Sequence, residues 1–344
     1  MRTSPTTAGD RRGPAEPAEV RTDPVIALDL GGTKLSGGLV GADGAVSHPV
    51  TVPTPATAGP EAILEAMAGL ARSLAAAAVA GGTPATGLGV GAAGVIDPAT
   101  GTVTAATDHL RGWAGTPVAD RLAAATGLPV RVVNDVHAHA LGEARHGAGA
   151  GRSSVLLVAA GTGLGGALVL DGRVLTGAHG VAGHLGHIPS PEAVGLPCSC
   201  GRTGHLESIA SGTGLLDRYL AGADNAPGTT PEARSGGDVA RLAAAGDPWA
   251  ASCLDRSAVA LARAVGGWIN ALDPDVVIVT GGLSEAGERW WGRLRDTVAA
   301  ETIPAAAGCP VVPAALGARA ALIGAATLLS HDHETTRTPV RGDR

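Results

Sequence analysis

The pattern of apolar and glycine-rich segments repeats itself in the two halves of this chain. Each half contains an apolar strand, a glycine-rich turn and a second apolar strand. These segments are residues 25–30, 31–34 and 35–40 in the first half and 155–160, 161–166 and 167–170 in the second. The repetition predicts an α/β fold made of two similar lobes, with a cleft between them.

Helical patterns follow both of these units. Long Ala- and Leu-rich stretches predict helices, and short apolar runs predict buried strands. The expected helices cover residues 60–80, 118–126, 247–270 and 315–329, and further strands cover 130–133 and 276–279. Pro60 and the Asp247-Pro248 pair are typical of helix starts. We expect the last helix, within residues 315–330, to fold back on the first lobe.

The two ends of the chain lack this pattern. Residues 1–23 and 331–344 are polar and rich in proline, threonine or charge, which predicts a disordered arm and a disordered tail. The first lobe is then residues 24–142, completed by the helix of 315–330, and the second lobe is residues 143–314.

Composition argues against several classes of function. A net charge of −6 disfavours general nucleic-acid binding. The N-terminal residues lack the apolar core of a secretory signal, and glycines break the longest apolar runs before they could span a bilayer. Four cysteines suit a reducing compartment. We therefore expect a cytoplasmic protein with no nucleic-acid or membrane partner.

Four potential metal ligands occur close together in the second half. His187 is followed by Cys198, Cys200 and His205, and thiolates and imidazoles are ligands that zinc prefers. The motif predicts a structural Zn²⁺ site that fixes a loop beside a substrate pocket. The alternative is two buried free cysteines and two surface histidines. Glu207, just beyond the last ligand, adds a carboxylate that a metal site alone does not need.

Both glycine-rich turns have features of phosphate sites. Glycines let backbone N–H groups approach phosphate oxygens closely, and a threonine adds a hydroxyl donor. The predicted contacts to a nucleotide are Asp29, Gly31, Gly32, Thr33 and Lys34 in the first turn and Gly161, Thr162 and Gly163 in the second. Asp29 is expected to hold Mg²⁺ through water. Either turn alone is more often a simple hairpin, and the spacing of a Walker loop is absent.

Two other strands end in polar or glycine residues. Residues 130–133 lead into Asn134-Asp135, where a carboxylate can act as general base for a hydroxyl nucleophile. Asn-Asp by itself is more often a turn. Residues 276–279 lead into Thr280 and then Gly281-Gly282, which we interpret as a shelf for adenosine. The alternative is an ordinary buried strand with a glycine turn.

Together these motifs resemble the sugar kinases of the ROK family (repressors, open reading frames, kinases), in the actin-like ATPase superfamily. The resemblance covers residues 25–329. It rests on D-L-G-G-T-K, N-D, G-T-G-L-G-G, G-H, C-S-C-G-R-T-G, L-E and V-T-G-G. It implies a two-lobed, ribonuclease H-like fold with a central cleft, the use of ATP, Mg²⁺ and structural Zn²⁺, and the homodimer usual in the family.

The resemblance also implies roles for individual residues. Asp135 would be the catalytic base that takes the proton from the sugar O6, and Asn134 would help to orient the sugar. Glu207 would accept hydrogen bonds from hydroxyls near C1 and C2. Gly94 would line the floor of the sugar site, and His187 would both ligate zinc and contact the sugar.

Three histidines depart from the family pattern. His205 stands where most family kinases have Cys, and imidazole can still ligate zinc. His109 replaces the usual Asn before Leu-x-Gly-Trp, in the part that recognises the far hydroxyls of the sugar. His184 stands where glucose-type members carry Glu, so this segment resembles bacterial N-acetylmannosamine kinases. A neutral imidazole can hydrogen-bond an acetamido group, although His184 can also be a residue of the pocket rim.

We therefore expect ATP-dependent phosphorylation of O6 of a hexose, with N-acetylmannosamine as the acceptor and glucose as the alternative. A sugar-responsive repressor fits less well, because it needs an N-terminal winged helix of roughly 60–80 residues and 24 residues precede the first strand. A non-catalytic sugar sensor is disfavoured because both glycine turns and Asp135 are intact.

Overall fold

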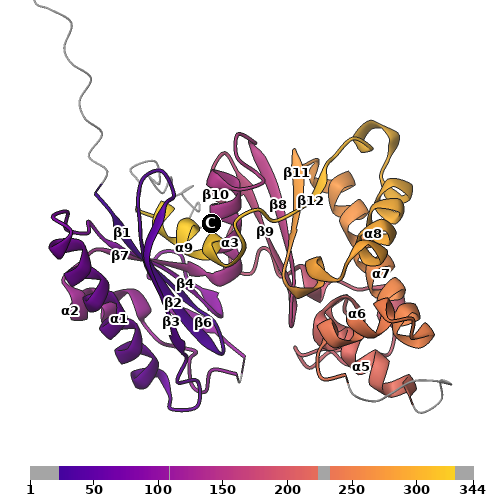
Figure 1. The fold of residues 1–344 in the computed structure, drawn as a ribbon, viewed down its shortest axis with the longest axis horizontal. Helices are drawn as coiled ribbons and strands as arrows, with labels where there is room; N and C mark the ends of the chain where they lie inside the picture. The colour runs from indigo at the N-terminus through magenta and orange to yellow at the C-terminus, as the bar shows by residue number, and fades with distance from the viewer. Residues whose placement is uncertain (1–22, 108, 224–232, 330–344) are drawn as a thin grey trace, which may run out of the picture.

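The structure is a computed structural model that describes residues 23–107, 109–223 and 233–329 of the chain. The predicted tail and all but the last residue of the predicted arm lie outside the described residues, as does Asp108. Within the described part, the chain forms two sheet-centred lobes on either side of a central pair of helices (Figure 1).

The two large sheets repeat one topology. In spatial order the first contains β3 (Val46–Pro53), β2 (Lys34–Val40), β1 (Val25–Leu30), β4 (Leu88–Ala92) and β7 (Val130–Asn134). The second contains β10 (Arg173–Val174), β9 (Leu164–Leu170), β8 (Ser154–Ala160), β11 (Val276–Thr280) and β12 (Val311–Pro313). Each has three parallel strands followed outward by two antiparallel ones. The duplicated α/β fold predicted from the two halves is therefore confirmed.

Helices cover the outer face of each sheet (Figure 1). The first lobe has α1 (Pro60–Ala80) and α2 (Val118–Thr126), and a small hairpin of β5 (Val95–Ile96) and β6 (Val103–Ala105). The second has α4 (Glu207–Ala210), α5 (Gly212–Ala223), α6 (Gly236–Ala244), α7 (Pro248–Leu272) and α8 (Glu288–Glu301). Short 3-10 turns are η1 (Leu185–His187), η2 (Pro191–Ala193), η3 (Gly282–Glu285), η4 (Pro304–Ala306) and η5 (Gly317–Arg319).

The alternation of side chains along β8 shows how the second lobe is layered. Leu156 and Val158 face the outer helices, whereas Val155 and Leu157 face the central pair. This period of two is expected of a strand that is covered on both faces. Both faces of β8 are therefore apolar core.

The central pair is α3 (Asp135–His146) and α9 (Ala320–Thr327). Ala138 of α3 packs with α9 against the first sheet, and Leu141 of α3 packs against the second. The two helices lie very close, because a Cβ built on Gly324 would be 1.8 Å from the carbonyl oxygen of Ala138. Glycine there lets the backbones approach. Helix α3 thus connects the cores of both lobes.

Helix α1 is long and apolar enough to cross a membrane by length and composition alone. Its residues Ile63, Leu64 and Met67 are buried in the core of the first lobe, against β1 and β4. Because its apolar face is covered by its own lobe, α1 is a core helix.

Most predicted elements lie within one or two residues of the expected bounds, and two differ by more. Residues 60–80 and 118–126 form the helices predicted for them. The last helix is shorter than the predicted 315–329, because the backbone N–H groups of Ala315 and Leu316 donate to the Glu143 carboxylate and Gly317 has φ +56°. The second glycine turn is also shorter, because β9 starts at Leu164 and the turn is left with residues 161–163.

Candidate active site

The register of the first sheet brings two carboxylates together. Asp29 of β1 pairs with Gly91 of β4, and Gly91 pairs with Val133 of β7, two residues before Asp135. A Cβ built on Gly91 would lie 3.5 Å both from Asp29 Oδ1 and from the Cα of Asp135. The two carboxyl groups therefore lie on either side of Gly91, near the carboxyl ends of parallel strands, where α/β sheets place their sites.

Asn134 fixes the start of α3. Its Oδ1 accepts hydrogen bonds from the N–H groups of Val136 (2.9 Å) and His137 (3.2 Å), which is the geometry of an N-cap. Its Nδ2 donates to the carbonyl oxygen of Gly94 at 2.9 Å. Asn134 therefore holds Asp135 at the first helical position and ties it to the turn at Gly94, where φ is +112°. One amide hydrogen is left for a substrate.

The electrostatics of the two carboxyl groups favour protonation. Burial raises the pKa of Asp135, although a hydrogen bond from the N–H of Val136 at 2.9 Å opposes this. Burial, and then the charge of Asp135, raise the pKa of Asp29 to about 7. A buried carboxylate with few donors has a raised affinity for protons. Such a group is suited to take a proton from a hydroxyl.

A cavity of about 430 Å³ lies between Asp135 and the second lobe. Its wall contains the start of α3, the glycine turn after β8, the end of β11 and the loop before α4. The predicted residues that line it are Asp135, Gly161, Thr162, Gly163, His184, His187, Glu207 and Gly281. The sequence assigned these residues to a base, a phosphate turn, a sugar site and, for Gly281, a shelf for adenosine, and all of them line this one cavity.

A second cavity, of about 440 Å³, continues from the first and shares Gly161 and Thr162 with it. Of the predicted residues, Gly282 also lines it. The residues that sequence reasoning missed are Gly212, Thr213, Leu216, Arg234, Ser235, Gly236, Gly237 and Leu283. A signal existed in Gly212-Thr213-Gly214, which repeats the Gly-Thr-Gly of the second turn.

The missed segment is joined directly to the glycine turn. The N–H of Gly212 donates to the carbonyl oxygen of Gly161 at 2.7 Å, and the N–H of Thr213 donates to that of Thr162 at 3.2 Å. The start of α5 and the second glycine turn therefore form one rigid edge between the two cavities.

Glu207 connects this turn to the cysteine loop. One carboxylate oxygen accepts a hydrogen bond from the N–H of Leu164 at 2.9 Å, and the other accepts one from the Ser199 hydroxyl at 2.5 Å. The carboxylate is thus held from both sides while it faces the first cavity.

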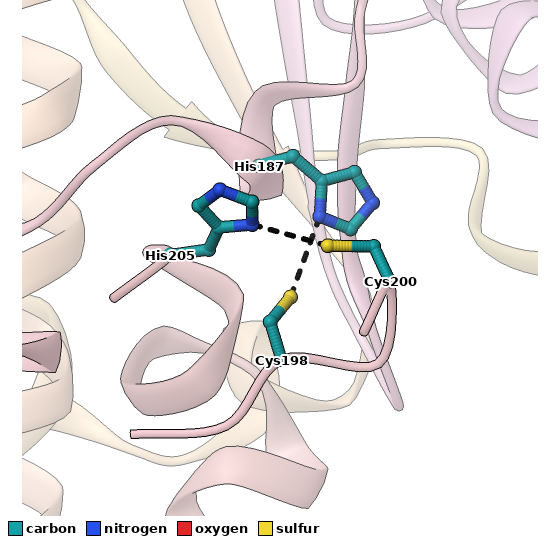
Figure 2. A group of neighbouring side chains, drawn as sticks. All are labelled: His187, Cys198, Cys200 and His205. Atoms are coloured by element: carbon teal, nitrogen blue, oxygen red, sulfur yellow. Dashed lines mark hydrogen bonds between the residues drawn. The ribbon is translucent and has the colours of Figure 1, made fainter. Parts of the chain in front are cut away.

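The four predicted metal ligands converge (Figure 2). Their donor atoms all lie within 4.8 Å of one another. His187 Nδ1 lies 3.5 Å from Cys198 Sγ, and His205 Nδ1 lies 3.2 Å from Cys200 Sγ. Burial lowers the pKa of His187, which keeps its imidazole in the neutral, ligating form. Two thiols and two imidazoles at these separations are a donor set that fits tetrahedral zinc.

His184 is an exposed residue at the edge of the first cavity. Its ring centroid lies 6.1 Å from that of His187, and its Nδ1 is 3.0 Å from the carbonyl oxygen of Val181. The same loop is held from α3, because His137 Nε2 is 3.0 Å from the carbonyl oxygen of Ala182. His184 is therefore presented at the cavity by a loop with a fixed backbone, and no described residue forms a hydrogen bond with its other ring nitrogen.

Several of the predicted nucleotide and sugar contacts line neither cavity. These are Asp29, Gly31, Gly32, Thr33, Lys34, Gly94, His109 and Asn134, all in the first lobe. The first turn is a closed hairpin, in which the N–H of Gly31 donates to the carbonyl oxygen of Lys34 at 2.9 Å, and Thr33 and Lys34 are exposed. His109 lies beside this hairpin, since a Cβ on Gly32 would be 3.9 Å from the Cβ of His109.

Comparisons with known proteins agree with these motifs. A model described as the ROK family matches residues 25–332. A glucokinase of Thermotoga maritima is 35% identical over 313 residues, which cover 89% of this chain and 96% of that protein. An N-acetylmannosamine kinase of Escherichia fergusonii is 34% identical over 308 residues, which cover 88% and 97%.

A solved structure agrees as well. The ROK family glucokinase from Streptomyces griseus, crystallised with glucose and AMPPNP, is 32% identical and has a TM-score of 0.74. The match covers 89% of this chain and 98% of that one. The chain therefore belongs to the ROK family and is an ATP-dependent sugar kinase with the two-lobed actin-like ATPase fold.

Proposed function

We propose that this kinase transfers the γ-phosphoryl group of ATP to O6 of a hexose, with Asp135 as the general base. The observation that carries this proposal is the partly buried carboxylate of Asp135 in the wall of the cavity that also contains the glycine turn 161–163. Asp135 takes the proton of the O6 hydroxyl while that oxygen forms a bond to the γ-phosphorus. The bond between this phosphorus and the bridging oxygen of ADP breaks.

The two connected cavities suit the two parts of the nucleotide. The cavity beside Gly212 and Arg234 would take adenosine, and the shared edge at Gly161 and Thr162 would take the phosphates through backbone N–H groups and a hydroxyl. Asp29 would hold Mg²⁺ through water, and this ion would neutralise charge that develops on the phosphates.

The first glycine hairpin would reach the same phosphates only after the lobes approach each other. Residues 31–34 line neither cavity. We therefore infer a closing motion between the lobe of residues 24–142 with 315–330 and the lobe of residues 143–314. Closure would bring Lys34 toward the phosphates and exclude water from the reacting groups.

For the acceptor we propose N-acetylmannosamine, and glucose is the second candidate. His184, His187 and Glu207 line one side of the cavity. Because Nδ1–H of His184 faces the carbonyl oxygen of Val181, the other nitrogen of a neutral imidazole there can accept a hydrogen bond from the N–H of an acetamido group. No carboxylate at this position then opposes the acetamido carbonyl. Glucose remains a candidate because relatives named glucokinase and N-acetylmannosamine kinase have nearly equal identities.

An ADP-release assay on N-acetylmannosamine, glucose, N-acetylglucosamine and fructose tests this proposal. We expect the highest kcat/KM with N-acetylmannosamine, and the ³¹P NMR spectrum of its product should show phosphate on O6. The variant His184→Glu should move the preference toward glucose, by roughly 10–100-fold. The highest kcat/KM for glucose in the unchanged protein would contradict the assignment of His184 but not the kinase activity.

We also propose that His187, Cys198, Cys200 and His205 bind one structural zinc ion. Zinc would fix the loop that carries Ser199 and therefore the orientation of Glu207. Metal analysis of purified protein should find about one zinc per chain. Cys200→Ser should lose it, whereas Cys309→Ser, outside the cluster, should keep it. Stable and active protein without metal would contradict this site.

Three predictions concern the surroundings of the enzyme. We propose that it acts in the cytoplasm, forms a homodimer and binds its sugar and ATP without a nucleic-acid or membrane partner. Light scattering of the purified protein tests the dimer, because it measures the mass in solution directly.

A further inference from the structure

His139 has a buried ring nitrogen that nothing in the described chain satisfies. It lies on α3, one turn after Asp135, and its Nδ1 is buried without a hydrogen-bond partner. The ring lines the same cavity as Asp135. A buried polar atom without a partner costs free energy, so such an atom needs an explanation.

Two carboxylates on α3 flank His139, and one of them already accepts three hydrogen bonds. Glu143 accepts hydrogen bonds from the N–H groups of Ala148 (2.9 Å), Ala315 (3.1 Å) and Leu316 (2.8 Å). Asp135 accepts one from the N–H of Val136, and no described side chain donates to it. Asp135 therefore has more unused acceptor capacity than Glu143.

The direction of helical side chains also favours Asp135. The Cα–Cβ bonds of a helix tilt toward its N-terminus, so a side chain covers the turn before its own. Residues four apart are neighbours on the helix surface. The ring of His139 therefore lies over the turn that carries Asp135 rather than the turn of Glu143.

Other titratable groups also lie near Asp135. His137 on α3 has its Nε2 3.0 Å from the carbonyl oxygen of Ala182. His184, His187 and Glu207 face the cavity from the second lobe, and Asp29 lies beyond Asp135 in the first sheet. Glu207 is held by Leu164 and Ser199. Burial lowers the pKa of His139, so its ring is neutral and has one N–H to donate.

We propose that His139 is a positioning residue for the kinase reaction: in the sugar-bound enzyme its Nδ1–H donates a hydrogen bond to the Asp135 carboxylate. This bond fixes the carboxylate so that its other oxygen faces the acceptor hydroxyl. The inference rests on the proposed role of Asp135 as base, and it adds a residue that acts through that base rather than on the sugar.

Two substitutions separate positioning from packing. His139→Leu removes the donor but keeps an apolar side chain of moderate size, whereas His139→Gln keeps an N–H donor that can reach one turn back. We expect His139→Leu to lower kcat up to about 100-fold with little change in the KM for sugar. His139→Gln should recover most of kcat. His146→Leu, at the far end of the same helix, is the matched control and should leave kcat unchanged.

The pH profile gives a second readout. A hydrogen bond to the carboxylate favours its charged form. Its loss in His139→Leu should therefore move the acidic limb of the kcat profile to higher pH, and His139→Gln should restore the limb. Melting temperatures of all variants are measured alongside, because a purely structural role would change them together with KM.

The outcomes distinguish this inference from the proposed function. If Asp135→Asn is as active as the unchanged enzyme, the assignment of the base is wrong and His139 has no carboxylate to position. If Asp135→Asn is inactive but His139→Leu keeps full kcat, or if Leu and Gln lower kcat equally, the inference on His139 alone is overturned. A fall in kcat for Leu that merely follows the melting temperature also overturns it.

Discussion

The two ends of α3 carry carboxylates in opposite circumstances. Glu143, near the C-terminal end, is fully buried and accepts three backbone N–H groups. Asp135, at the N-terminal end, is partly buried, lines a cavity near Asp29 and accepts a single hydrogen bond from the next residue. Both belong to one helix that connects the two lobes.

The donors of Glu143 explain what that end does. Ala148 lies on the connection from α3 to β8, whereas Ala315 and Leu316 lie on the connection from β12 back to α9. Glu143 therefore joins the two chain segments that run between the lobes. The comparison indicates that a structural carboxylate has several donors and no contact with a cavity, whereas a carboxylate that can accept a proton from a substrate has few donors and faces a cavity.

The largest effect is expected from Asp135→Asn. Asparagine has nearly the same shape but cannot accept the hydroxyl proton, so kcat should fall by about 10²–10⁴. Calorimetry should find sugar binding within a few-fold of the unchanged protein, and the melting temperature should not fall. A kcat within a few-fold of that of the unchanged enzyme would contradict the role of Asp135 as the general base.

A pH-dependent stability effect is expected from Asp29→Asn. Because the pKa of Asp29 is raised to about 7 from 3.8, the folded chain holds this proton more tightly than the unfolded chain. The stabilisation that this bound proton gives to the folded state is therefore fully present below pH 3.8, and it is lost as the pH rises through about 7. The amide of the Asn variant does not titrate. The free energy of unfolding of the variant should therefore rise relative to that of the unchanged protein as the pH rises. The gain should reach up to about 4 kcal/mol, because one pKa unit corresponds to about 1.36 kcal/mol.

Urea unfolding at pH 5 and pH 8, without magnesium or nucleotide, measures this difference. The gain should be clearly larger at pH 8. Asp97→Asn is the matched control, because hydrogen bonds from the Ala99 N–H and the Thr100 hydroxyl lower the pKa of Asp97. Its contribution is present above its unfolded pKa and lost on acidification, so its effect should have the opposite sign. An equal gain for Asp29→Asn at both pH values would contradict the raised pKa.

A smaller effect on stability is expected from Glu143→Gln. An amide has one oxygen acceptor where the carboxylate has two, so at least one of the three N–H groups is left without a partner. The free energy of unfolding should fall by about 1–3 kcal/mol, as urea unfolding would measure. Glu65→Gln, an exposed residue paired with Arg72, should change it by less than about 0.5 kcal/mol. An unchanged free energy of unfolding for Glu143→Gln would contradict the structural role of the Glu143 carboxylate.

Much of the fold followed from local patterns. Helices 60–80 and 118–126 have the predicted bounds because Pro60 and Gly127 mark a start and an end that the backbone requires. The cysteine–histidine cluster was also visible, because its four ligands lie within a short stretch of sequence.

The remaining features depend on contacts between distant residues. Glu143 meets Ala315 and Leu316 across more than 170 residues, and this contact shortens the last helix. The second cavity is lined by residues that are distant in sequence, such as Arg234 and Gly282. The sequence did not indicate a role for His139. Two histidines occur close together on α3, and the sequence could not show that His137 has a structural partner whereas His139 does not.

A crystal structure with N-acetylmannosamine and AMPPNP tests the central claim most directly, because it measures the distance from Asp135 to the acceptor oxygen. The account predicts a carboxylate oxygen of Asp135 within about 2.6–3.2 Å of the sugar O6, with the glycine turn 161–163 on the phosphates. A closed complex in which Asp135 lies far from every sugar hydroxyl would contradict it.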